Sequence, residues 1–195
     1  MDNLEYVPEV HRYLYKGKTI PSATQIVAWR YPKTYDKIPS YVLKKAADYG
    51  TLVHETIEKV NAKAITDEEV HDLGPEVRRA VKDYELLMKK ACMFPESFEQ
   101  MICWKGRYAG TYDILTKDNV LIDIKTTSKI HVDNETKEAP LNLQLSLYAM
   151  ALGVKEAWYL HLPKKGKASI GKVELWDEKD LVKLIEEYEK EFEPL

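Results

Sequence analysis

The sequence contains few cysteines and no long apolar run. Its two cysteines, Cys92 and Cys103, cannot supply the four thiolates of an iron–sulfur cluster or of a structural zinc site. We expect two reduced thiols rather than a disulfide. No stretch approaches the roughly 20 apolar residues of a membrane span, and the opening residues MDNLEYVPEV lack the basic and apolar regions of a secretory signal. These absences predict a cytoplasmic protein that has no membrane partner.

The sequence also lacks an excess of positive charge. It has 29 Lys and Arg against 32 Asp and Glu, for a formal net charge of -3. This balance argues against a protein that coats nucleic acid through bulk charge, although it leaves room for a local basic groove. None of the eight glycines belongs to a Walker-type nucleotide-binding motif. The chain therefore carries no helicase or ATPase motor of its own.

The spacing of the apolar residues predicts an α/β chain with one domain over residues 1–195. We expect three parts: an N-terminal hairpin with helices over 6–92, a sheet with one helix over 97–175, and a C-terminal helix over 177–193. Alternating apolar residues predict strands over 97–104, 108–116, 120–127, 157–163 and 168–176. Helical spacing, with Ser22 and Pro140 as start signals and Gly153 as a stop, predicts the helices.

Gly50 interrupts the helix predicted over residues 40–63. An interior glycine costs a helix about 1 kcal/mol relative to alanine. We therefore expect another group to approach the backbone closely at Gly50.

The strand VLIDIKTT combines a carboxylate and an ammonium with apolar neighbours. Because side chains alternate along a strand, Asp123 and Lys125 lie on one face, roughly 6.5–7 Å apart. A short turn at residues 117–119 brings the preceding strand alongside, so Asp113 approaches Asp123 across the ladder. Two adjacent carboxylates repel each other, and Mg²⁺ or Mn²⁺ relieves that repulsion. The backbone carbonyl of Ile124 would add an oxygen ligand, and Lys125 would orient the attacking water.

Taken alone, an Asp-x-Lys sequence on a strand is usually a solvated face or a cross-strand ion pair. Four motifs in order change that interpretation: Gly50-Thr51-Leu52-Val53-His54, Gly110-Thr111-Tyr112-Asp113, Asp123-Ile124-Lys125-Thr126-Thr127, and Gln144-x-x-x-Tyr148. Together they resemble the PD-(D/E)xK nuclease superfamily and, within it, the RecB-type branch that includes phage exonucleases. The match covers residues 50–150, and the opening HRYLYKGKTIPSATQI is similar to that of phage members.

The resemblance implies a role for each matched residue and a restriction-endonuclease-like fold, with a mixed central β-sheet flanked by helices. Asp113 and Asp123 would be metal ligands and Lys125 the catalytic lysine, with His54 reaching in from its helix as a further ligand. Glu99 matches an acidic position of some members. From the residues alone, His54 is more often a hydrogen-bonded helix histidine, and Glu99 is equally well an exposed strand carboxylate.

Gln144 and Tyr148 are four residues apart and share a helical face. The resemblance puts this face at the active site, where it would touch the DNA backbone or orient Lys125. The alternative is an ordinary amphipathic helix whose polar side includes a glutamine.

The expected function is a Mg²⁺- or Mn²⁺-dependent DNA exonuclease of bacterial or phage origin, acting in recombination, repair or phage replication. Its partners would be DNA ends or single-stranded regions, and a recombination or replication protein. The alternatives are a structure-specific endonuclease or junction resolvase, or a non-catalytic DNA-binding subunit.

Several residues are candidates for DNA contacts outside the metal site. An aromatic group could stack on unpaired bases, although a hydrophobic cluster bracing the first helix is the simpler interpretation; it consists of Trp29, Tyr31 and Tyr35. Basic residues in loops and on one helix could contact phosphates, with only two or three of them expected to do so. They are Lys44, Lys45, Lys105, Arg107, Lys129, Lys164, Lys165 and Lys167.

Overall fold

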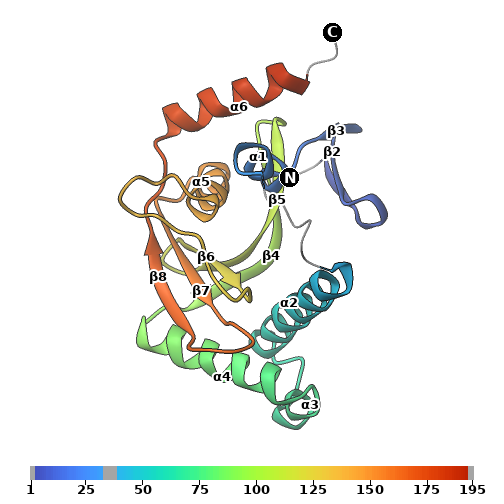
Figure 1. Ribbon diagram of the computed structural model, residues 1–195, viewed down its shortest axis with the longest axis vertical. Helices are drawn as coiled ribbons and strands as arrows, with labels where there is room; N and C mark the ends of the chain where they lie inside the picture. The colour runs from blue at the N-terminus through green and yellow to red at the C-terminus, as the bar shows by residue number, and fades with distance from the viewer. Residues whose placement is uncertain (1–2, 33–38, 193–195) are drawn as a thin grey trace.

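A five-stranded mixed sheet forms the centre of the computed structural model, which describes residues 3–32 and 39–192 (Figure 1). Its strand order is β4-β5-β6-β7-β8, and every neighbouring pair is antiparallel except β6 with β7. These two strands are parallel because helix α5 (Pro140–Leu152) carries the chain from one to the other. The strands are β4 (Pro95–Trp104), β5 (Tyr108–Thr116), β6 (Val120–Lys125), β7 (Glu156–His161) and β8 (Ser169–Val173).

Helices cover both faces of this sheet. On one face, α5 packs with α1 (Ala23–Arg30) and α6 (Glu178–Phe192) against residues such as Leu121. On the other, α2 (Ser40–Asn61), α3 (Asp67–Asp72) and α4 (Pro75–Lys90) pack against Ile122 and Ile124. The two apolar clusters therefore follow the predicted alternation of β6, which turns Leu121 to the opposite side from Ile122.

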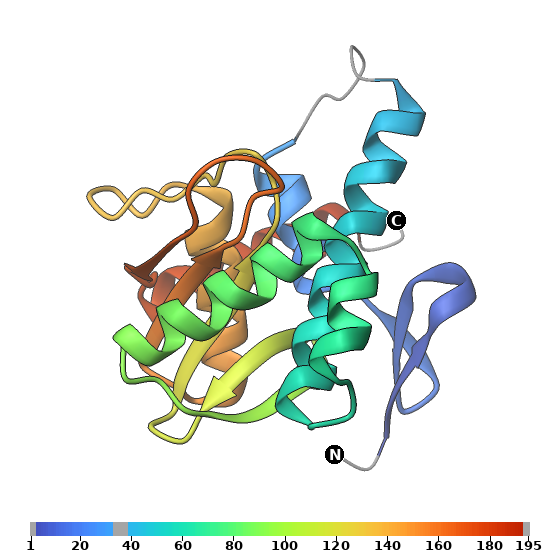
Figure 2. The same cartoon turned by 90° about the horizontal axis from the view of Figure 1, so that it is seen from below.

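A small second sheet is attached to the first. Its antiparallel strands β1 (Leu4–Val7), β2 (Arg12–Tyr15) and β3 (Lys18–Ile20) stand apart from the helices that cover the central sheet (Figure 2); the short 3-10 helix η1 (Pro8–Val10) links the first two. Hydrogen bonds and apolar contacts join the sheets. Just after β3, the Pro21 carbonyl accepts from the Ala109 N–H at 3.0 Å, the Tyr13 and Thr111 hydroxyls are 2.9 Å apart, and Leu4 and Tyr13 pack with Ala109. The N-terminal sheet is thus anchored two residues from Asp113.

The predicted mixed α/β core with flanking helices is confirmed. Local signals explain several boundaries: Ser22 forms a capping box with Gln25 at the start of α1, and Gly153 ends α5 with a φ of 72°. The sequence interpretation missed β1 and α3, which are only four and six residues long. Both cysteines are free.

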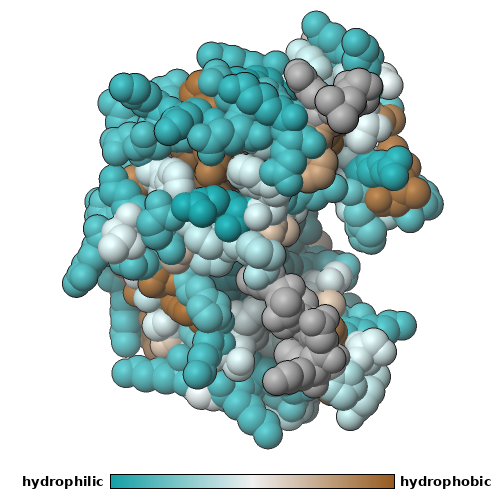
Figure 3. All heavy atoms as spheres, turned by 45° about the horizontal axis from the view of Figure 1, so that its top comes forward, coloured by the Kyte–Doolittle hydropathy of each residue, from teal (hydrophilic) through white to brown (hydrophobic). Residues whose placement is uncertain are grey.

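In the face drawn in Figure 3, apolar residues lie in small patches scattered among hydrophilic residues. Within the described ranges, no helix combines the length and the apolar character needed to cross a membrane.

Candidate metal centre

Strands β5 and β6 part at the position of the two predicted carboxylates. Their pairing is confined to Ile114 with Ile122 and Leu115 with Leu121. Continued pairing would set Asp113 directly opposite Asp123. Instead, Asp113 Oδ2 accepts a hydrogen bond from the Ile124 N–H at 2.5 Å. Asp113 still lies close enough to Asp123 for the Asp123 charge to raise its pKa, but the Asp113 side chain takes the place of a ladder bond between the strands.

The parted strands also leave the Ile124 backbone without a ladder partner on β5. In an antiparallel ladder, the N–H and C=O of one residue point to the same neighbouring strand. Since the Ile124 N–H meets Asp113, its carbonyl faces the same opening. This is the carbonyl that the strand geometry and the oxygen preference of Mg²⁺ suggest as a ligand.

Glu99 has a left-handed backbone in the middle of β4. Its φ of 45° lies in a region that costs L-residues about 1–2 kcal/mol, and the register sets it opposite Asp113. The regular alternation of faces breaks here: Ile114 packs with α2 and α4, whereas Tyr112, two residues away, packs with α5. The irregular backbone brings Glu99 and Asp113 to one place, as strained residues at functional sites often do.

Helix α2 contributes His54 to the same place. Its Nδ1 lies 3.3 Å from Glu99 Oε1 and 3.5 Å from Asp113 Oδ1. One ligand atom from each of the three residues lies within 4.8 Å of the others. Three side chains from α2, β4 and β5 therefore converge, although the sequence separates His54 from Asp113 by 59 positions.

Asp123 lies beside this trio but outside it. Its side chain is 3% exposed, and Oδ2 forms an ion pair with Lys125 Nζ at 2.7 Å. That oxygen nevertheless has no partner in hydrogen-bond geometry among the described residues. The Lys125 ammonium balances the charge of this buried oxygen, and a carboxylate oxygen has a further lone pair that a second cation could meet.

Gln144 links Lys125 to helix α5. The Lys125 ammonium donates to Asp123 Oδ1 at 3.0 Å and to Gln144 Oε1 at 3.2 Å. The Gln144 amide nitrogen in turn donates to Asp123 Oδ1 at 3.3 Å and to the Tyr148 hydroxyl at 3.5 Å. These contacts form a chain from Tyr148 to Lys125, as expected if the glutamine–tyrosine face orients the lysine.

Two glycines allow neighbouring elements to pack closely around these hydrogen-bonded residues. A Cβ at Gly110 would lie 2.6 Å from Tyr148 Cε1, so only glycine lets the ring rest on β5. A Cβ at Gly50 would lie 3.1 Å from Thr126 Oγ1. This is the close approach that the interior glycine predicts, and it presses α2 against the end of β6.

The crowded carboxylates of this site shift the pKa values of the groups around them. Burial lowers the pKa of His54, but the hydrogen bond to Glu99 and the charges of Asp113, Glu99 and Asp123 outweigh burial and raise it to about 9. Burial and then Asp123 raise the pKa of Asp113, against the opposing effect of His54 and Lys125. Burial also opposes the charge of Lys125, yet the two aspartates keep its pKa raised. Protons on His54 and Asp113, together with the Lys125 ammonium, therefore offset part of the negative charge of the carboxylates.

The convergence opens onto a cavity of about 460 Å³ between α2 and β4. Its lining includes three glutamates and His54 but neither lysine nor arginine; the residues are Gly50, Thr51, His54, Glu55, Glu58 and Glu99. Glu55 and Glu58 were not predicted from the sequence. The available signal was at Glu58, which lies four residues after His54 and therefore shares its helical face; Glu55 lies three residues before Glu58.

His161 is a second residue that sequence analysis missed. It pairs in register with Lys125 on the parallel strand, is 9% exposed, and sets its Nε2 2.7 Å from the Thr127 carbonyl. This hydrogen bond fixes the backbone of Thr127, just after the end of β6. Its signal was a histidine at the end of a strand parallel to β6.

The other candidates lie in different surroundings. Arg107 pairs with Glu189 of α6, and Lys105 rests over Trp104, so neither faces the metal centre. Trp29 packs edge-on against Tyr188, and Tyr31 bonds Glu138, so both brace α1 as the simpler interpretation predicts. Tyr35 lies outside the described residues.

Comparisons with known proteins bear on the fold. No protein-family model matches the chain, and no curated protein matches its sequence. The solved structure of the protein SSO0001 is similar, with a TM-score of 0.51 at 16% identity over 89% of this chain and 76% of that one. An alkaline exonuclease from Laribacter hongkongensis (LHK-Exo) gives a TM-score of 0.49 at 12% identity over 88% and 87%. The first likeness indicates a shared fold; the second, below 0.5, does not establish one.

Proposed function

We propose that the protein is a divalent-metal-dependent DNA nuclease that hydrolyses phosphodiester bonds. The observation that carries this proposal is the convergence of His54, Glu99 and Asp113 beside a buried Asp123–Lys125 pair. Buried carboxylates that lie close together repel one another and lose hydration, which costs folding free energy, and a bound metal ion would offset that cost. A lysine beside such a group supplies the positive charge that a phosphoryl-transfer transition state requires.

The donor set fits Mg²⁺ or Mn²⁺. Carboxylate oxygens suit both ions, and the imidazole of His54 suits Mn²⁺ better than Mg²⁺. Asp123 Oδ2, which already faces the Lys125 ammonium, has a second lone pair that could serve as a further ligand. Two cysteines on separate elements provide no soft-metal alternative. We assign the site to His54, Asp113 and Asp123, with Glu99 and the Ile124 carbonyl as additional donors.

A bound divalent cation would polarise the scissile phosphate and lower the pKa of a water molecule. The remaining chemistry belongs to the chain. Lys125, held protonated by the aspartates, would stabilise the negative charge that develops on the phosphate. Gln144 fixes the direction of the Lys125 ammonium, and Tyr148 fixes Gln144. Hydrogen bonds of this kind, formed before the substrate arrives, need no reorganisation during the reaction.

Within nucleases we favour an exonuclease, on the resemblance of the four motifs to the RecB-type branch. The test compares linear, nicked and covalently closed plasmid DNA in Mg²⁺, in Mn²⁺ and in EDTA. An exonuclease degrades the linear form and leaves the closed circle intact. Cutting of the closed circle would establish an endonuclease instead.

The same assay tests the site. Asp113→Asn and Lys125→Ala should each abolish detectable cleavage. Asp118→Asn is the matched control, because Asp118 lies exposed in the turn of the same hairpin. It should retain full activity. If the wild-type protein cuts no DNA in either metal, the proposed function is wrong.

A further inference from the structure

The loop between β7 and β8 carries a concentrated positive charge. Three of its four residues 164–167 are lysines, and residues 162–168 include no acidic side chain. Lys164, Lys165 and Lys167 are all exposed, and within the described part of the chain none of them forms a salt bridge. Their charges are therefore free to meet an anion.

Helix α4 holds this loop through its backbone. The Arg79 guanidinium donates to the carbonyl of Pro163 at 2.6 Å and to that of Lys164 at 2.7 Å. Pro163 is itself buried. Because the anchor uses main-chain oxygens, it fixes the position of the loop without neutralising the lysines.

The anchored loop lies beside the metal centre. Lys164 Nζ is 5.2 Å from the ring centroid of Tyr49 on α2. Tyr49 directly precedes Gly50, which abuts Thr126 at the end of β6, and His54 follows one helical turn later. Figures 1 and 2 both draw the β7–β8 loop against α2 and α4. The cavity at His54, by contrast, is lined by glutamates.

We propose that Lys164, Lys165 and Lys167 form a phosphate-binding clamp that holds the backbone of the DNA strand beside the metal centre. A polyanion is repelled by the glutamates around His54, so its flanking phosphates need positive charge close by. Exposed lysines on a fixed loop supply that charge without reading bases. This inference rests on the proposed function for its choice of DNA, but it concerns binding and can be measured without cleavage.

The test measures DNA binding in a Lys125→Ala background with Mg²⁺ present, so that the DNA stays intact. Fluorescence anisotropy gives the affinity for two oligonucleotides of unrelated sequence between 50 and 300 mM KCl. The variant carries Lys164→Ala, Lys165→Ala and Lys167→Ala together. Each phosphate contact contributes about 0.7–0.9 to the slope of log affinity against log salt, so the slope should fall in magnitude by about 2 to 3. Both oligonucleotides should lose affinity equally.

The matched control removes the same charge from another surface. Lys179, Lys183 and Lys190 lie on α6, which covers the opposite face of the sheet. Changing these three to alanine should leave the slope unchanged. If both triple variants lose the same salt slope, the effect comes from net charge and the clamp is refuted. An unchanged salt slope in the loop variant would refute it as well.

Failure of the clamp is distinguishable from failure of the proposed function. A wild-type protein that cleaves DNA while the loop variant binds normally refutes the clamp alone. A loop variant that loses the salt slope supports the clamp even if the wild type cuts nothing.

Discussion

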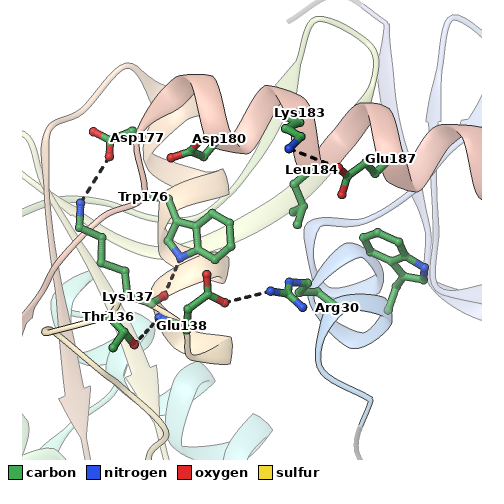
Figure 4. A pocket seen from close by; sticks show the side chains of 11 residues that line it. Arg30, Thr136, Lys137, Glu138, Trp176, Asp177, Asp180, Lys183, Leu184 and Glu187 are labelled. Carbon is green, nitrogen blue, oxygen red and sulfur yellow. Dashed lines mark hydrogen bonds and ion pairs between the residues drawn. The ribbon is translucent and has the colours of Figure 1, made fainter.

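Two hollows in the described part of the molecule differ in how their charges are matched. The larger, of about 850 Å³, lies between α1, α6 and the loop before α5. Figure 4 shows three ion pairs within or beside it: Arg30 with Glu138 at 3.1 Å, Lys137 with Asp177 at 3.7 Å, and Lys183 with Glu187 at 3.9 Å. The ring nitrogens of its two tryptophans, Trp29 and Trp176, also donate hydrogen bonds, to Glu191 and to the Lys137 carbonyl.

The smaller hollow has the opposite character. Three glutamates and His54 line it, and two further aspartates lie behind His54. Size is therefore not our reason for proposing the smaller hollow as the functional site. The reason is the negative charge that the chain leaves unmatched there, because a fold retains such a cost where a ligand relieves it.

Lys125→Ala against Lys183→Ala is the strongest test of this contrast. Lys125 pairs with Asp123 beside the smaller hollow, and Lys183 lines the larger one, so each change removes one cation from one of the two regions. Loss of Lys125 should lower kcat for DNA cleavage by at least about 10³-fold, to below the detectable rate, since it removes charge stabilisation at the reacting phosphate. Lys183 is 76% exposed, and its loss should leave kcat unchanged. Equal rates in the two variants would refute a special role for the smaller hollow.

The pH dependence of stability offers a second test, in metal-free protein. The pKa of His54 is raised from 6.5 to about 9, so its protonation stabilises the fold fully below pH 6.5, and this contribution is lost as pH rises through 9. The raised pKa of Asp113 acts in the same direction.

The shift at His54 corresponds to roughly 3 kcal/mol, and each kcal/mol moves Tm by about 2–4 °C in a chain of this size. Between pH 6.5 and 9.5, wild-type Tm should therefore fall by on the order of 5–10 °C more than that of His54→Gln. Thermal melts followed by circular dichroism measure the difference. Parallel curves for the two proteins would contradict the assigned electrostatics.

Metal binding separates the hollows by ligand chemistry. His54→Gln should weaken Mn²⁺ binding by about tenfold to a hundredfold, because it removes a nitrogen donor. Glu138→Gln removes a carboxylate from the larger hollow and should not change the affinity. Electron paramagnetic resonance of free Mn²⁺ gives both constants. The assignment of His54 as a ligand fails if the two variants bind equally well.

The smallest expected effect concerns the contact that holds α2 against β6. Gly50→Ala gains up to about 1 kcal/mol of helix propensity but brings its Cβ to 3.1 Å from Thr126 Oγ1. In a Thr126→Ala background the gain should appear undiminished. Urea denaturation of the four proteins should give a coupling of about 0.5 kcal/mol or more. If the changes in the free energy of unfolding are additive, Gly50 and Thr126 do not interact through a close contact.

Much of the fold was predictable because local patterns reflect local geometry. The period-two pattern of β6 correctly separated Leu121 from Ile122, and Pro140 and Gly153 correctly bounded α5. The short elements β1 and α3 were missed, since four to six residues carry too little periodicity to stand out.

By itself, the sequence determined which side chains share a face. It set Asp123 beside Lys125 and Gln144 beside Tyr148, because strand and helix periods follow from backbone geometry alone. Only the tertiary structure decided that β5 and β6 part, that Glu99 takes a left-handed backbone, and that His54 meets Asp113. These depend on how apolar faces of distant elements pack, and no local pattern of residues encodes that approach. In the proposed metal centre, the pairs Asp123–Lys125 and Gln144–Tyr148 therefore follow from local spacing. The convergence of His54, Glu99 and Asp113 depends on the tertiary fold.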